Sequence, residues 1–102
     1  MALKGEYATI AAAGTTQATA AEMPSYMVMV TSATSAQGVI LPPLNKGEEA
    51  IVCNGVTDVE IFVYPRSGGK INNYSADAHI WLSANCAARF LAVDSLNVIA
   101  FF

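Results

Sequence analysis

After Tyr26 the chain contains a series of short runs that are typical of β-strands, and some of them alternate in side-chain character with the two-residue period of a strand. The clearest example is "DVEIFVY" over residues 58–64, in which branched apolar side chains alternate with Glu60, Phe62 and Tyr64. In "YMVMVTS", residues 26–32, methionines alternate with valines, so this strand can be buried on both faces. Residues 58–64 therefore predict a strand with two distinct faces, and residues 26–32 predict a strand that is apolar on both faces.

Further short β-prone runs follow one another, separated by residues that are typical of turns. Pro42 and Pro43 close one run, because proline cannot donate a hydrogen bond within a sheet. Asn54-Gly55 closes another and is a strong hairpin signal. These runs are "GVILPP" (38–43), "AIVCN" (50–54), "AHIWLS" (78–83), "ARFLAV" (88–93) and "NVIAFF" (97–102). The spacing predicts one all-β domain over residues 26–102, a small antiparallel sandwich or barrel.

Residues 1–25 differ in composition from the rest of the chain. They are rich in alanine and threonine, and Gly14 interrupts any long helical face. This segment predicts an extended N-terminal arm that ends near Pro24, with a short helix from Gln17 to Met23 as the alternative. Arms of this kind often become ordered on a partner.

The composition adds an expectation about association. Hydrophobic residues make up 54% of the chain and charged residues 13%, about half the usual charged share. Part of the apolar surface is therefore expected to lie against another subunit or a partner. The alternative is a monomer in which the many alanines raise the hydrophobic fraction. The C-terminal "AFF" either closes the core or seals a subunit interface.

The charge and the apolar runs argue against two classes of partner. The net charge is -3, and the five Lys and Arg residues are scattered, whereas nucleic-acid binding needs a clustered basic surface. No apolar run approaches the roughly 18 residues of a membrane span. The N-terminus lacks a convincing signal-peptide core, so synthesis in a cytoplasm is expected.

The sequence "PRSGGK", residues 65–70, invites comparison with a phosphate-binding loop. That motif needs a glycine at position 64 and a serine or threonine at position 71. The chain has Tyr64 and Ile71 there. We therefore predict a long hairpin connection, in which Gly68 and Gly69 supply positive φ angles.

No other residues form a catalytic or metal-binding pattern. His79 is the only histidine and shares a predicted strand face with Trp81. General-base and metal sites need further groups at defined spacings. Cys53 and Cys86 are predicted to be two buried free thiols, because cysteine in apolar surroundings commonly acts as a small hydrophobe. We expect neither an enzyme nor a bound cofactor or metal.

The run "GVILPPLNKGEEAIVCNGVTDVEIFVYPRSGGKINNY", followed by "AHIWLSANCAARFLAV", resembles a pattern frequent in small virion proteins of tailed phages. A strand ends in Leu-Pro, a glycine turn leads to a strand that ends in Asn, and a β-run closes in Val-Tyr-Pro. A glycine-containing loop then leads to Ile-Asn and an alanine-rich strand that closes in Phe. The matching positions are Leu41, Pro42, Gly47, Asn54, Val63, Tyr64, Pro65, Gly68, Gly69, Ile71, Asn72 and Phe90. Trp81 lies earlier than the tryptophan near the final strand of typical examples.

The resemblance covers roughly residues 38–93 and implies a structural role. It indicates a head decoration or cement protein on the capsid exterior, bound to the major capsid protein as a symmetric homo-oligomer, commonly a trimer. Many weak contacts would then combine through multivalency. A fibre or spike module for trimerisation or receptor binding is the alternative within the virion class. A carbohydrate-binding module, with sugar stacked on Trp81, Tyr64 and Tyr74, is a hypothesis from a different class.

Overall fold

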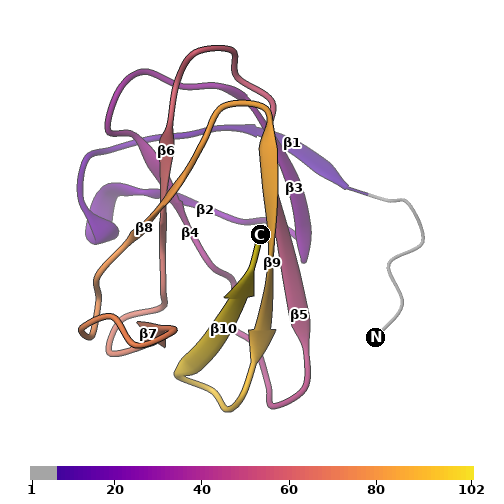
Figure 1. The fold of residues 1–102 in the computed structure, drawn as a ribbon, viewed down its shortest axis with the longest axis vertical. Helices are drawn as coiled ribbons and strands as arrows, with labels where there is room; N and C mark the ends of the chain where they lie inside the picture. The colour runs from indigo at the N-terminus through magenta and orange to yellow at the C-terminus, as the bar shows by residue number, and fades with distance from the viewer. Residues whose placement is uncertain (1–6) are drawn as a thin grey trace.

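The computed structural model describes residues 7–102, which form two β-sheets packed against each other (Figure 1). The larger sheet has the strand order β1-β3-β5-β9-β10-β7, and the smaller sheet has the order β2-β4-β6-β8. The predicted all-β class is confirmed. The strands are β1 (Ala8–Ala11), β2 (Ala21–Glu22), β3 (Met27–Ser32), β4 (Gly38–Ile40), β5 (Glu49–Asn54), β6 (Ile61–Tyr64), β7 (Lys70–Ile71), β8 (Ile80–Leu82), β9 (Cys86–Ala92) and β10 (Asn97–Phe101).

The chain winds like a short solenoid through its first six strands. Consecutive strands alternate between the two sheets, so β1, β3 and β5 lie side by side in the larger sheet, and β2, β4 and β6 in the smaller. Neighbours within each of these sets are parallel. Each connection between parallel neighbours passes through a strand of the opposite sheet, which gives the length that a parallel crossover needs.

The winding reverses after β6. β8 runs antiparallel to β6, β9 antiparallel to β5, and β10 antiparallel to β9, while the short β7 is parallel to β10. The predicted antiparallel pairing is therefore wrong for most of the sandwich: five of the eight strand pairings in residues 7–102 are parallel. Alternation assigns each strand an inner and an outer face but leaves its partner and direction open.

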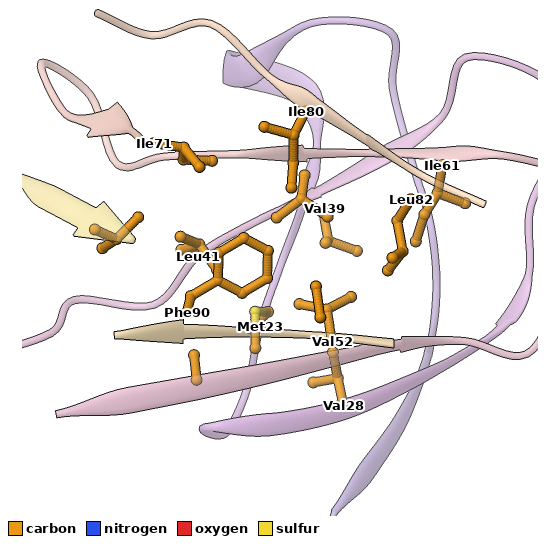
Figure 2. Close-up of a cluster of buried hydrophobic side chains, with 14 of the residues drawn as sticks. Met23, Val28, Val39, Leu41, Val52, Ile61, Ile71, Ile80, Leu82 and Phe90 are labelled. Carbon is orange, nitrogen blue, oxygen red and sulfur yellow. The ribbon is translucent and has the colours of Figure 1, made fainter. Parts of the chain in front are cut away.

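The core lies between the two sheets (Figure 2). Val28, Val52 and Phe90 of the larger sheet are fully buried against residues of the smaller sheet such as Ile61 and Leu82. The alternation predicted for residues 58–64 is found in β6, where Ile61 and Val63 are fully buried. Phe62 lies between them in sequence and faces the opposite side.

The segment predicted as an N-terminal arm is part of both sheets where the structure describes it. β1 pairs with β3, and β2 pairs with β4. The 3₁₀ helix η1 (Gln17–Thr19) lies between β1 and β2 in the chain. Ala12 and Met23 belong to the main core. Small alanine side chains let this segment pack closely, so residues 7–25 form an integral part of the sandwich rather than an arm. Residues 1–6 of the predicted arm lie outside the described residues.

The Asn54-Gly55 step is a connection between sheets and not the predicted hairpin turn. β5 belongs to the larger sheet and β6 to the smaller. The Asn54 side chain is buried, and its Nδ2 donates to the carbonyl oxygens of Val59, Leu82 and Ser83 at 2.8, 3.1 and 3.2 Å. Its Oδ1 accepts the Val56 amide at 3.1 Å. The side-chain amide of Asn54 therefore fixes the path of the chain from β5 to β6 and holds this connection beside the end of β8.

Candidate functional site

The twelve motif residues of the sequence pattern hold the fold together rather than surround one cleft. Leu41 and Phe90 are in the main core, and Pro65 is fully buried. The structure brings Leu41, Pro42 and Pro65 together around a very small cavity. Gly47 takes a positive φ of 87° in the turn before β5, and its amide donates to Ala92 at 2.8 Å.

The loop after β6 joins the smaller sheet to β7 in the larger sheet, so the predicted hairpin connection is also wrong. The Gly69 amide donates to the Arg66 carbonyl oxygen at 2.7 Å, and Gly68 has a φ of +83°. The Gly68 amide donates to Asp77 Oδ1 at 2.6 Å. The Asp77 carboxylate therefore already accepts a hydrogen bond from one of the backbone amides that a phosphate-binding loop would offer to its ligand.

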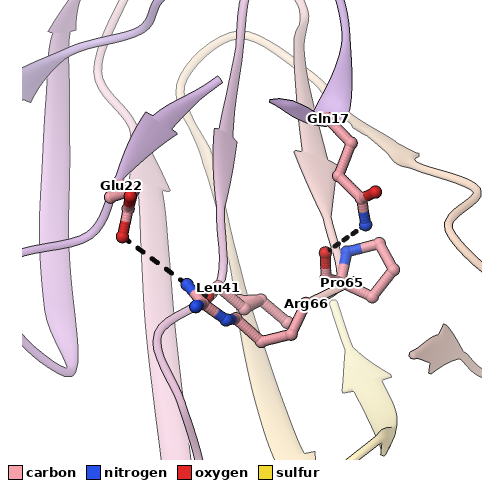
Figure 3. A network of polar contacts seen from close by, with 5 residues as sticks. All are labelled: Gln17, Glu22, Leu41, Pro65 and Arg66. Atoms are coloured by element: carbon pink, nitrogen blue, oxygen red, sulfur yellow. Dashed lines mark hydrogen bonds and ion pairs between the residues drawn. The ribbon is translucent and has the colours of Figure 1, made fainter. Parts of the chain in front are cut away.

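Polar contacts tie this loop to the N-terminal segment (Figure 3). Gln17 Nε2 donates to the Pro65 carbonyl oxygen at 2.8 Å. Arg66 Nη1 lies 3.6 Å from Glu22 Oε1 and donates to the Leu41 carbonyl oxygen at 3.5 Å. The loop thus contacts η1, β2 and the end of β4, and its arginine makes structural contacts.

Asn72 closes β7 in a conformation that few residues adopt. It has a φ of +55°, and its Oδ1 accepts the Ala100 amide of β10 at 2.9 Å. Asparagine tolerates the left-handed region better than most residues. The Ile-Asn step of the motif therefore ends a strand and connects it to its neighbour.

Aromatic side chains gather on the outer face of the smaller sheet. Phe62 of β6 stacks on His79 with ring centroids 3.9 Å apart and meets Trp81 edge-to-face at 4.7 Å. Tyr64 meets His79 edge-to-face at 5.3 Å. The predicted pairing of His79 and Trp81 on one face is confirmed, with 5.9 Å between their rings. We call Phe62, Tyr64, His79 and Trp81 the aromatic cluster.

The two ends of this cluster differ in exposure. At one end Tyr64 is only 5% exposed, because Ala20 and Ile40 pack against it. Its hydroxyl donates to the Thr15 carbonyl oxygen at 3.3 Å, and burial raises the pKa of Tyr64. Trp81, on the edge strand β8, is 57% exposed at the other end. Tyr64 is therefore unavailable for the sugar stacking predicted for it, whereas Trp81 is accessible.

A shallow groove of about 500 Å³ lies beside Trp81. Tyr74, in the turn after β7, is 51% exposed and forms part of its lining. The full lining is Asn73, Tyr74, Ser75, Ala78, His79 and Trp81. Two of the three aromatic residues predicted to bind sugar, Tyr74 and Trp81, are thus brought to one groove.

The outer face of the larger sheet is mostly apolar. Because Val28, Val52 and Phe90 point into the core, their strand neighbours point outward. Strand register places these neighbours in rows across the sheet. Ile99 and Phe101 of β10 are 42% and 43% exposed. We call this surface the apolar face; its members are Met27, Met29, Ile51, Cys53, Ala87, Leu91, Ile99 and Phe101.

One ion pair lies on the apolar face. Arg89 Nε is 3.4 Å from Glu49 Oε1, and the Arg89 guanidinium carbon is 4.9 Å from the centre of the Phe101 ring. Both cysteines are free; burial raises the pKa of Cys53, which lies on this face. Cys86 is exposed, contrary to the prediction that both thiols are buried.

Within residues 7–102, no group of three or more His, Cys, Asp or Glu side chains is arranged to hold a metal ion. None of the helices in the described part of the chain is long and apolar enough to cross a membrane. Comparisons with protein-family models, curated proteins and solved structures find no match. The two surfaces described above are therefore the basis for a functional proposal.

Proposed function

We propose that the protein is a structural component of a tailed-phage virion, a head decoration or cement protein that self-associates and binds the major capsid protein. The observation that carries this proposal is the apolar face, an extended outer sheet surface with a single ion pair. A contiguous apolar surface that is left partly exposed is typical of interaction sites. The resemblance of residues 38–93 to small phage virion proteins supports the same role.

In this proposal the apolar face is buried between copies of the chain in a symmetric homo-oligomer, a trimer. Residues such as Ile99 and Phe101 would lie at the interface, where aromatic side chains contribute strongly. The assembled oligomer, made in the host cytoplasm, would bind the capsid exterior through several equivalent contacts. Once one contact has formed, the others form at a high local concentration, so the overall affinity exceeds that of any single contact. The role requires no catalysis, cofactor, nucleic acid or membrane.

The experiment measures the disruption temperature of capsids that lack the protein, before and after purified protein is added. We expect the wild-type protein to raise that temperature. Ile99→Asp places a charge on the apolar face at a partly exposed site, so we expect a folded chain that associates at least tenfold more weakly and no longer protects the capsid. Trp81→Ala, on the opposite sheet, is the matched control and should protect like the wild type.

Two outcomes would contradict the proposal. If wild-type protein leaves the disruption temperature unchanged, the decoration role is wrong. If Ile99→Asp, shown to be folded by its unfolding midpoint, sediments with the same oligomeric mass as the wild type, the apolar face is not the interface between copies. A fibre or spike module remains the second candidate, and the groove beside Trp81 is the observation that favours its receptor-binding form.

A further inference from the structure

We propose that the groove beside Trp81 binds a neutral sugar unit, a hexose or N-acetylhexosamine of a glycan chain, stacked on the Trp81 ring. This inference goes beyond the assembly role, because it concerns the opposite sheet and a ligand of a different chemical class. It depends on three features of the groove: a fixed and exposed aromatic ring, polar groups around it, and a lining without carboxylate, ammonium or guanidinium groups.

The first feature is the way Trp81 is held. Trp81 lies directly opposite Phe62 in the β6–β8 pair, and the two rings meet edge-to-face at 4.7 Å. Phe62 is itself stacked on His79 at 3.9 Å. The indole is thus supported from one side, yet it remains 57% exposed. A supported ring loses little conformational entropy when a ligand stacks on it, so less of the binding energy is lost to ordering.

The second feature is the polar rim of the groove. Asn73 and Ser75 are exposed and lie on either side of Tyr74 in the turn after β7. The side chains of Asn73, Ser75, Tyr74 and His79 offer both donors and acceptors. A sugar ring presents one apolar face of C–H groups and a rim of hydroxyl groups. An aromatic platform edged by amide, hydroxyl and imidazole groups complements both parts.

The third feature is charge. The six residues that line the groove contain no carboxylate, ammonium or guanidinium group. Asp77, which is nearby in sequence, accepts the Gly68 amide at 2.6 Å and Gln17 Nε2 at 3.1 Å. Phosphate-bearing ligands need cationic partners, so a nucleotide or nucleic acid does not fit this lining. A neutral polyhydroxylated ligand does.

The size of the groove agrees with this ligand class. Its volume of about 500 Å³ lies inside the range of roughly 300–1,000 Å³ that is common for small-molecule sites. The groove is open and shallow, so it suits a unit within a chain that continues past the protein at both ends. We therefore expect oligosaccharides to bind more tightly than the free monosaccharide.

The test uses the full chain and the fact that Trp81 is its only tryptophan. Intrinsic fluorescence therefore reports on the groove itself. An array of neutral hexose and N-acetylhexosamine oligomers selects an oligosaccharide, which is then titrated while Trp81 emission is recorded. We expect a saturable change in emission, and a dissociation constant that is at least tenfold larger for Tyr74→Ala. Array binding should be lost in Trp81→Ala and largely kept in Trp81→Phe.

Phe102→Ala is the matched control, because Phe102 is also an exposed aromatic residue but does not line the groove. We expect it to bind within twofold of the wild type. The proposal is wrong if no neutral oligosaccharide binds, or if binding survives in folded Trp81→Ala. It is also wrong if proline-rich peptides, and no glycans, change Trp81 emission. The two proposals can fail separately, because glycan binding tests this inference and the capsid disruption temperature tests the assembly role. Trp81→Ala should abolish the first and leave the second unchanged.

Discussion

Gly68 and Gly69 are neighbours, yet glycine is required at each position for a different reason. Gly68 has a φ of +83°, and a Cβ there would meet nothing within 4 Å. A Cβ on Gly69 would lie 2.5 Å from the Leu96 carbonyl oxygen and 2.9 Å from that of Arg66. The first position is limited by backbone conformation and the second by space.

We therefore expect Gly68→Ala to lower the free energy of unfolding by about 1 kcal/mol, the cost of a left-handed L-residue. Gly69→Ala forces a shift of backbone in two loops and should cost about 2 kcal/mol or more. Urea unfolding of both variants measures the difference. Lys70→Ala, which removes an exposed side chain, is the control and should stay within about 0.5 kcal/mol. Equal losses at the two glycines would contradict this explanation.

The sequence predicted that both glycines supply positive φ, and only Gly68 does. The role of Gly69 depends on Leu96, which is distant in sequence and reaches the loop only because β7 pairs with β10. Asn54 shows the same limit. Its local sequence indicates a hairpin, but its amide is used for carbonyl groups of Val59, Leu82 and Ser83. Local patterns identify residues with special backbone roles but not the distant groups that they contact.

At the scale of elements, the turn between β9 and β10 gives a prediction about pH. Asp94 Oδ1 accepts hydrogen bonds from the Asn97 side chain at 3.1 Å and from the Leu96 and Asn97 amides, both at 2.9 Å. These bonds, that of the Asn97 side chain first, lower the pKa of Asp94. Because the pKa of Asp94 is lower in the folded state, its carboxylate stabilises the fold at pH values above the ordinary aspartate pKa of about 3.9. This stabilisation is lost as the pH falls through the lowered pKa.

Asp94→Ala should therefore lower the urea midpoint near neutral pH, and the difference from the wild type should shrink as the solution is acidified. Urea unfolding at about pH 7 and at a series of decreasing pH values below about 3.9 measures this. Ser95→Ala changes the same turn without removing a titratable group, so its effect should not depend on pH. A difference between Asp94→Ala and wild type that is constant across this range would show that the carboxylate does not stabilise the turn.

The elements themselves were predicted unevenly. The apolar runs that became β3, β4, β5, β6, β8, β9 and β10 were all recognised as strands, because each combines branched or aromatic residues with flanking turn residues. β1, β2 and β7 were missed. β2 and β7 are two residues long, and β1 is half alanine, so none has enough local signal. They are strands because longer strands beside them supply hydrogen-bonding edges.

At the scale of the whole molecule, the face that each side chain occupies was predictable, but what covers that face was not. Tyr64 and Trp81 both lie on the outer face of the smaller sheet, as alternation indicates. The segment that contains Thr15 and Ala20 covers Tyr64, whereas Trp81 stays 57% exposed. The solenoid winding brings that segment over one end of the sheet and leaves the edge strand β8 open. The groove beside Trp81 is thus a product of topology, and only its residue types were visible in the sequence.

The winding also determines what the N-terminal segment contributes to stability. An arm separate from the domain could be removed without effect, whereas here β1 and β2 pair with β3 and β4. We expect removal of residues 1–25 to lower the free energy of unfolding by several kcal/mol, or to abolish cooperative unfolding, because Ala12 and Met23 leave the core.

A single substitution separates packing from the other effects of truncation. Met23 is buried between the sheets, so Met23→Ala should cost about 2–4 kcal/mol. Met27→Ala is the matched control: it removes the same side chain from the half-buried outer face of β3 and should cost clearly less. Urea midpoints that are unchanged by both the truncation and Met23→Ala would show that residues 1–25 behave as an arm. A large loss in both would show that β1, β2 and the segment between them are an integral part of the two sheets.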